Sequence, residues 1–135
     1  MGLTYVQLRI SNPARPRGGA RLKFLVDSGA IYSSVVPSPI LRRLGIKPGT
    51  TRSFILADGT EVKRSLGQAL FQLDGIEGAS PVIFGEAGDS VLLGSVSLEA
   101  LGLMLDPLKR ELRPLPMLLA PQSPAHKQRS SPIES

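Results

Sequence analysis

The segment Phe24-Leu25-Val26-Asp27-Ser28-Gly29-Ala30 joins an apolar run of strand type to one carboxylate and a tight turn. Gly29 permits the turn because glycine accepts backbone conformations closed to other residues, and the small Ala30 leaves room beside it. Ionised carboxylates are rarely found in apolar surroundings unless they are paired or functional. A strand that delivers Asp27 into a Ser-Gly turn is therefore a candidate functional site.

The composition indicates one domain with many turns. The chain has 135 residues, which is enough for a modest core, and its 14 glycines and 12 prolines favour a β-rich fold over a helical bundle. Cysteine is absent from the sequence, so disulfides and thiolate metal sites are excluded. We expect neither a metal nor a cofactor.

The sequence shows no signal for a membrane. No apolar run is long enough to span a bilayer, and the N-terminus lacks the apolar core of a signal peptide. We expect a cytoplasmic protein with no membrane partner.

The net charge of +5 raises the question of a nucleic-acid or acidic partner. The basic residues are dispersed along the chain and are not interleaved with aromatic residues. This pattern favours a solvated basic surface, and we expect no nucleic-acid partner. The basic residues in question include Arg9, Arg15, Arg17, Arg21, Lys23, Arg42 and Arg43.

Hydrophobic periodicity predicts a series of strands separated by turns. The Asp58-Gly59 and Asp74-Gly75 pairs predict tight hairpin turns, since both central residues of such turns accept positive φ. Gly67 indicates a bulge or bend within its strand. The predicted strands cover residues 5–10, 21–26, 31–37, 51–56, 61–73, 80–84, 91–94 and 108–113, and a long loop rich in Pro and Gly is expected over 12–20.

Two short helices complete the prediction. Ser38 is expected to cap the first helix, with Pro39 at its first helical position and Gly45 just past its end. The second helix is expected over residues 96–101, closed by Gly102. The domain is expected to span residues 1–116, followed by a Pro-rich, disordered tail over 117–135.

Asp27-Ser28-Gly29-Ala30 resembles the Asp-Thr/Ser-Gly-Ala signature of aspartic proteases, and the chain has about the size of one subunit of the retropepsin-like, retroviral type. In that family two chains each contribute one such loop. The resemblance covers roughly residues 3–116 and suggests a single-domain member of the bacterial type.

Further segments match the family in the same order along the chain. The hairpin Ala57-Asp58-Gly59-Thr60 falls where the family has its flap. Leu92-Leu93-Gly94 matches the motif of two apolar residues and a glycine that packs behind the catalytic loop. The strand over 108–113 falls where the family places a strand in its dimer interface.

Two residues depart from the family pattern. Ser28 replaces the commoner threonine, which keeps the hydroxyl. Ser95 stands where retroviral enzymes usually have arginine, which leaves open how the second helix is anchored.

The resemblance implies a mainly β, retropepsin-like half-barrel: a closed β-barrel with a flap hairpin and one or two short helices, paired as a homodimer. It implies an aspartic endopeptidase that acts on a peptide or protein substrate. Asp27 would be catalytic, and Ser28 would hydrogen-bond across the dimer axis. Gly29 would expose backbone groups to the substrate.

Other carboxylates and other chemistries fit the sequence less well. Asp58, Asp74 and Asp106 stand in turn dipeptides, where a structural role is expected, so Asp89 is the one rival to Asp27. The single histidine, His126, lies in the tail, which leaves a Ser-His triad or a histidine zinc site without its parts. Two alternatives stay open: a catalytically silent dimer of the same fold that binds extended peptides, and a basic β-barrel that binds nucleic acid.

Overall fold

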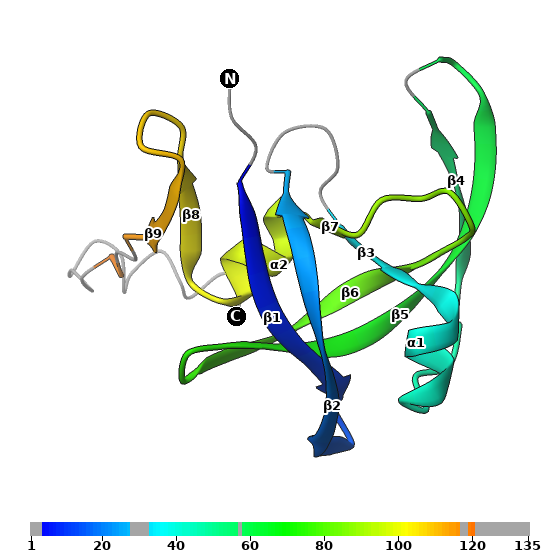
Figure 1. Cartoon of the computed structure of the whole chain (residues 1–135), viewed down its shortest axis with the longest axis horizontal. Helices are drawn as coiled ribbons and strands as arrows, with labels where there is room; N and C mark the ends of the chain where they lie inside the picture. Colours follow the sequence, from blue (N-terminus) through cyan, green and yellow to red (C-terminus); the bar gives the residue numbers. More distant parts are fainter. Residues whose placement is uncertain (1–3, 28–32, 57, 117–118, 121–135) are drawn as a thin grey trace, which may run out of the picture.

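The computed structural model describes residues 4–27, 33–56, 58–116 and 119–120, and this part of the chain is mainly β (Figure 1). The expected β-rich class with two short helices is confirmed: α1 (Ser38–Arg43) and α2 (Ser95–Ala100). The strands are β1 (Tyr5–Asn12), β2 (Arg15–Val26), β3 (Ser34–Pro37), β4 (Thr51–Ile55), β5 (Glu61–Leu73), β6 (Ile76–Gly85), β7 (Leu92–Leu93), β8 (Leu103–Asp106) and β9 (Glu111–Pro114).

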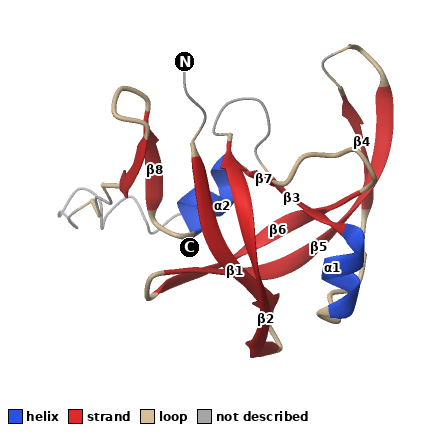
Figure 2. Ribbon diagram, viewed as in Figure 1, coloured by secondary structure: helices blue, strands red, loops and turns tan. Residues whose placement is uncertain are grey.

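Seven of the described strands form one sheet in the order β1-β2-β7-β3-β6-β5-β4 (Figure 2). β5 also pairs with β1, so the hydrogen-bonded pairings return to the first strand. The β2–β7 and β3–β6 pairs are parallel, and the other pairs are antiparallel. The short β7 therefore lies between β2 and β3, two strands that it follows by more than fifty residues in the sequence.

In β1, β2 and β5 the apolar core is built from alternate residues. Leu8 and Ile10 of β1 and Phe24 of β2 are fully buried, as their alternation predicts. Phe24 packs against Phe71 of β5 with ring centroids 6.0 Å apart. Each such side chain contributes about 1.5–3 kcal/mol by leaving water, so the register that directs them inward is strongly favoured.

The prediction of a long loop over residues 12–20 is wrong. β1 and β2 continue as a hairpin to a short turn at Pro13 and Ala14, where the Ala14 N–H donates to Asn12 Oδ1 at 2.9 Å. A Cβ on Gly19 would lie 2.6 Å from the carbonyl oxygen of Ile10. Gly19 therefore allows the two strands to pack closely. Composition alone does not distinguish a glycine in this role from a glycine in a loop.

The first helix begins one residue earlier than expected. Pro37 occupies the N-cap position, and the Ser38 hydroxyl, predicted to be the cap, instead accepts a hydrogen bond from Arg42 Nε at 3.1 Å. The predicted end is confirmed, because Gly45 has φ +80° and its N–H donates to the carbonyl of Arg42. The next N–H, of Ile46, donates to the carbonyl of Leu41 at 3.0 Å, which completes a Schellman motif.

Gly67 marks a close approach and not a bulge. The β5–β6 register runs without a shift from Leu66 to Leu73. A Cβ on Gly67 would lie 2.9 Å from Cε1 of Phe84, so a side chain there would displace the core. The bend expected at this point coincides with a change of partner, since β5 pairs with β4 up to Ser65 and with β6 from Leu66.

The tight turn predicted at Asp74-Gly75 is observed. Asp74 and Gly75 form the two-residue turn between β5 and β6 with φ of 46° and 87°. The predicted strand over 108–113 starts later, at Glu111, because residues 107–110 form the turn of the β8–β9 hairpin. Asp106 organises that turn by accepting hydrogen bonds from the N–H groups of Leu108 and Lys109. Apart from residues 119 and 120, the expected tail lies outside the described residues.

Candidate active site

Asp27 follows directly on β2 and is half-buried. Its backbone N–H donates to the carbonyl of Leu93 at 2.9 Å. Two residues earlier, the N–H of Leu25 donates to the carbonyl of Val91 at 3.0 Å. The strand end that carries the carboxylate is therefore held by the segment around β7.

The Leu92-Leu93-Gly94 segment lies beside the end of β2 that leads into Asp27. Leu92 pairs with Leu25 on one side and with Val35 on the other, and Leu93 is fully buried. Two segments some sixty residues apart in the sequence are thus brought into contact by the parallel pairing of β2 with β7. The resemblance predicts that Leu92-Leu93-Gly94 packs behind the loop that Asp27 begins, and the structure brings Leu92 and Leu93 together with the end of β2.

Buried serines anchor this arrangement. The Ser34 hydroxyl accepts from the N–H of Gly94 at 3.0 Å and donates to the Ser97 hydroxyl at 2.6 Å. Ser97 and Ser80 hydroxyl oxygens are 2.8 Å apart, and Ser80 also donates to the carbonyl of Pro81. All three serines are at most 1% exposed. Buried hydroxyls require partners of this kind, because an unpaired polar group is costly inside a core.

Ser34, Ser80 and Ser97, here called the serine chain, hold α2 against the sheet. Ser97, in the middle of α2, joins this helix to β3 through Ser34 and to β6 through Ser80. Sequence reasoning missed all three residues. In the sequence, each of these serines stands within or beside an apolar run. That pattern does not separate a buried serine from an exposed one.

The hairpin of β4 and β5 carries the predicted flap residues. The two strands pair from Thr51↔Ser65 to Ile55↔Glu61, and their turn stands clear of the remaining sheet (Figure 1). Gly59 has φ +89°, and the Thr60 N–H donates to Asp58 Oδ1 at 2.9 Å. Hydrogen bonding to Thr60 also lowers the pKa of the Asp58 carboxyl.

A cavity of about 530 Å³ lies between this hairpin and the body of the protein. Its size falls within the range of ligand-binding clefts. Leu92, next to the Asp27 strand end, forms part of its wall, and so do Asp89 and Arg64. The other apolar side chains on the wall come from the hairpin (Phe54, Ile55, Leu56 and Val62) and from the body (Val35 and Ile83).

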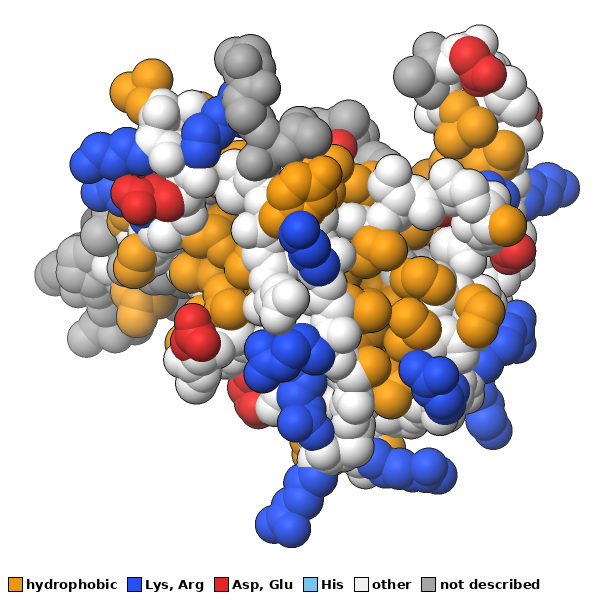
Figure 3. All heavy atoms as spheres, in the orientation of Figure 1, with side chains coloured by type: hydrophobic (Ala, Val, Ile, Leu, Met, Phe, Trp, Pro, Cys, Tyr) orange, Lys and Arg blue, Asp and Glu red, His pale blue; other side chains and the backbone are white. Residues whose placement is uncertain are grey.

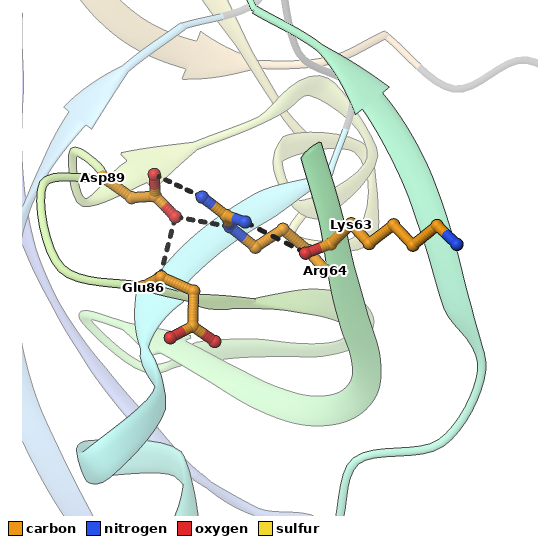
Figure 4. Close-up of polar contacts among 4 residues, drawn as sticks. All are labelled: Lys63, Arg64, Glu86 and Asp89. Atoms are coloured by element: carbon orange, nitrogen blue, oxygen red, sulfur yellow. Dashed lines mark hydrogen bonds and ion pairs between the residues drawn. The ribbon is translucent and has the colours of Figure 1, made fainter. Parts of the chain in front are cut away.

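Asp89, the rival carboxylate, is held in an ion pair (Figure 4). Its oxygens accept from Nε and Nη2 of Arg64 at 2.8 and 3.1 Å, and Oδ2 also accepts from the N–H of Glu86 at 2.7 Å. The guanidinium of Arg64 holds the pKa of the Asp89 carboxyl below its usual range. The pair connects the loop before β7 to the base of the hairpin, which is a structural use of this carboxylate.

Several predicted site residues lie outside the described part of the chain: Ser28, Gly29, Ala30 and Ala57. Within the described residues, no group of three or more His, Cys, Asp or Glu side chains could hold a metal ion. None of the helices described there is long and apolar enough to cross a bilayer.

Comparisons with known proteins give a match only at the level of solved structures. No family model matches the chain, and no curated protein matches it. The chain is similar to the solution structure of the protease of simian foamy virus (mac), with 22% sequence identity and a TM-score of 0.47. That match covers 70% of this chain and 92% of the viral one.

Proposed function

We propose that this chain is an aspartic endopeptidase whose active site forms when two copies pair. The observation that carries the proposal is the hydrogen bond from the Asp27 N–H to the Leu93 carbonyl, within the parallel pairing of β2 and β7. It joins the Asp-Ser-Gly-Ala segment to the Leu-Leu-Gly segment, which are two of the parts of the sequence that resemble the retropepsin-like family. The continuous pairing of strands back to β1 supports a closed barrel of the same type.

The proposed chemistry requires two carboxylates. Amide hydrolysis needs a base that activates water and an acid that protonates the leaving nitrogen. Two aspartates held close together cannot both ionise, so they share one proton and supply both functions. Each chain offers Asp27 as its suitable carboxylate, since Asp89 is engaged by Arg64. A twofold axis that places Asp27 beside its copy completes the pair, and the titration then belongs to the pair as a unit.

The cavity beside the hairpin supports a peptide substrate. Its apolar wall suits the side chains of an extended peptide, and a hairpin edge offers backbone groups for strand-like pairing. Ile55 and Leu56 are 72% and 43% exposed near the tip of the hairpin. Closure of this hairpin over a bound peptide would cover these side chains and exclude water from the reaction.

The test is cleavage of a peptide library at mildly acid pH, with and without a pepstatin-type inhibitor. The wild-type chain is expected to cleave, and Asp27→Asn is expected to lose cleavage while it still dimerises. Glu99→Gln, which removes an exposed carboxylate from α2, is the matched control and is expected to cleave like the wild type. Equal cleavage by Asp27→Asn would overturn the proposal. Peptide binding by the wild type without cleavage would identify the silent binder instead.

A further inference from the structure

The register of the β1–β2 hairpin gathers basic side chains that are dispersed in the sequence. Arg9 lies opposite Arg21, and Gln7 lies opposite Lys23. Side chains that are opposite each other in an antiparallel pair project from the same face. Because the neighbouring residues of both strands point into the core, this face is the outer one. Figure 3 shows Lys and Arg side chains gathered over this hairpin.

The same face contains a hollow of about 440 Å³, here called the arginine pocket. β5 adds to it, since Gln72 pairs with Arg9 on the side of β1 away from β2. The pocket brings together three guanidinium groups, two amides and one carboxylate. The residues are Gln7, Arg9, Arg17, Arg21, Gln72 and Asp74.

Two of the residues that line this pocket each have one buried polar atom without a partner among the described residues. Arg9 Nη2 donates to the backbone carbonyl of Arg17, but Arg9 Nε is buried without an acceptor. Gln72 Nε2 donates to Glu77 at 3.2 Å, while Gln72 Oε1 is buried without a donor. A buried polar atom without a hydrogen bond costs about 1–3 kcal/mol. Both atoms are covered in this conformation, so a ligand with an acceptor for Arg9 and a donor for Gln72 would remove both costs once the two side chains rotate toward it.

Gly19 is part of this arrangement. A Cβ at that position would lie 2.8 Å from Arg9 Nε, so the absence of a side chain lets Arg9 extend along the surface of β2. Its guanidinium is thereby directed toward the Arg17 end of the hairpin.

From these observations we infer that the arginine pocket binds the phosphate group of a hydroxyl-bearing phosphate ester. The phosphate oxygens accept hydrogen bonds from Arg9, Arg17 and Arg21, because the planar fork of a guanidinium matches a phosphate in a bidentate manner. A hydroxyl of the ester donates to Gln72 Oε1 when that side chain rotates toward the pocket. The three guanidinium groups of the pocket outweigh its one carboxylate, Asp74, so the local charge favours an anion.

This site is independent of the proposed peptidase site. Arg21 lies in β2, six residues before Asp27, which directly follows that strand. Because a strand rises about 3.3 Å per residue, the two residues are about 20 Å apart. Ligand binding at the arginine pocket can therefore be measured whether or not the chain cleaves peptides.

The experiment is a titration of the full chain with ribose 5-phosphate, followed by backbone amide shifts in nuclear magnetic resonance spectra. Shifts are expected to centre on Gln7, Arg9, Arg21 and Gln72. Arg17→Gln and Arg21→Gln, which change exposed residues, are each expected to weaken binding about tenfold, or 1.4 kcal/mol. Arg43→Gln, which removes an exposed arginine from α1, is the matched control and should bind like the wild type.

A variant that is expected to tighten phosphate binding provides a second test. Asp74→Asn removes the one carboxylate of the pocket and keeps the turn, since asparagine accepts the positive φ found at Asp74. It is expected to tighten binding several-fold. Absence of saturable binding at millimolar ligand, equal losses in Arg21→Gln and Arg43→Gln, or weaker binding by Asp74→Asn would each overturn the inference.

Two further ligands identify the source of the phosphate. A short RNA strand that binds more tightly than ribose 5-phosphate, with a steeper dependence on salt, would assign the pocket to a nucleic-acid backbone. Tighter binding of the small ester would assign it to a free metabolite of that class. Polyglutamate that competed as well as either would show that charge alone is recognised, which would contradict the inference.

Discussion

The hydroxyl of Ser34 donates to the hydroxyl of Ser97 across 2.6 Å, and both residues are completely buried. Ser34 is also the acceptor for the N–H of Gly94. This contact therefore joins α2 to the segment that supports Asp27. Its contribution can be measured through the stability of the protein.

Ser97→Ala is expected to lower the free energy of unfolding by about 1–3 kcal/mol. The substitution removes the acceptor of Ser34 and a partner of Ser80, and it leaves buried hydroxyls with fewer hydrogen bonds. Ser95→Ala, on the same helix but only half-buried, is the control and should change stability by less than about 0.5 kcal/mol. Urea denaturation of both variants provides the measurement. Equal free energies of unfolding for Ser97→Ala and Ser95→Ala would show that the serine chain does not anchor the helix.

Gly67→Ala is expected to destabilise the protein by about 1–3 kcal/mol through overpacking. The added methyl would lie 2.9 Å from Phe84 and 3.2 Å from the carbonyl of Lys47, and the backbone carbonyl cannot move freely. Gly18→Ala is the matched control, because nothing lies within 4 Å of its added methyl. That control should be neutral or stabilising by up to about 1 kcal/mol, since alanine restricts the unfolded chain. Thermal unfolding of the two variants would contradict the packing explanation if both melted at the same temperature.

The ion pair between Arg64 and Asp89 predicts a stability difference that depends on pH. The pKa of Asp89 is lowered in the folded protein, chiefly by its hydrogen bonds from Arg64. The pair therefore stabilises the fold above the ordinary carboxyl pKa of 3.8, and this contribution is lost as the pH falls through the lower folded pKa.

Arg64→Gln should accordingly cost about 1 kcal/mol near neutral pH, a modest value because both side chains keep some contact with solvent. The difference between wild type and variant should shrink toward zero at the acid end of a pH series of urea denaturations. A difference that stayed constant across the series would show that Arg64 acts through packing alone.

Cleavage activity is expected to depend on protein concentration, since the proposed active site draws one Asp27 from each of two chains. Specific activity should rise with concentration and then reach a plateau. Addition of an equal amount of Asp27→Asn at the plateau should lower wild-type activity by about half, because random pairing places half of the wild-type chains with an inactive partner. Activity that was unaffected by the inactive chain would contradict a shared active site.

Short-range signals were sufficient to predict the turns at Gly45 and at Asp74-Gly75 and to single out Asp27 as a candidate. Positive φ at Gly45 and at Asp74-Gly75 follows from local steric rules, and the structure has these residues where the local pattern predicts them. The apolar alternation in β1 likewise agrees with the burial of Leu8 and Ile10. The Asp27 segment could be recognised because an acid at the end of an apolar strand is unusual in itself.

Long-range pairing decided the rest, because a residue's neighbours in space are set by register and not by adjacent sequence. Gly19 and Gly67 allow close approach to Ile10 and Phe84, although the sequence pattern predicted a loop at Gly19 and a bulge or bend at Gly67. The serine chain and the arginine pocket have the same origin. Each combines residues from separate strands, and only the energy of burying a common core holds those strands in the register that brings the side chains together.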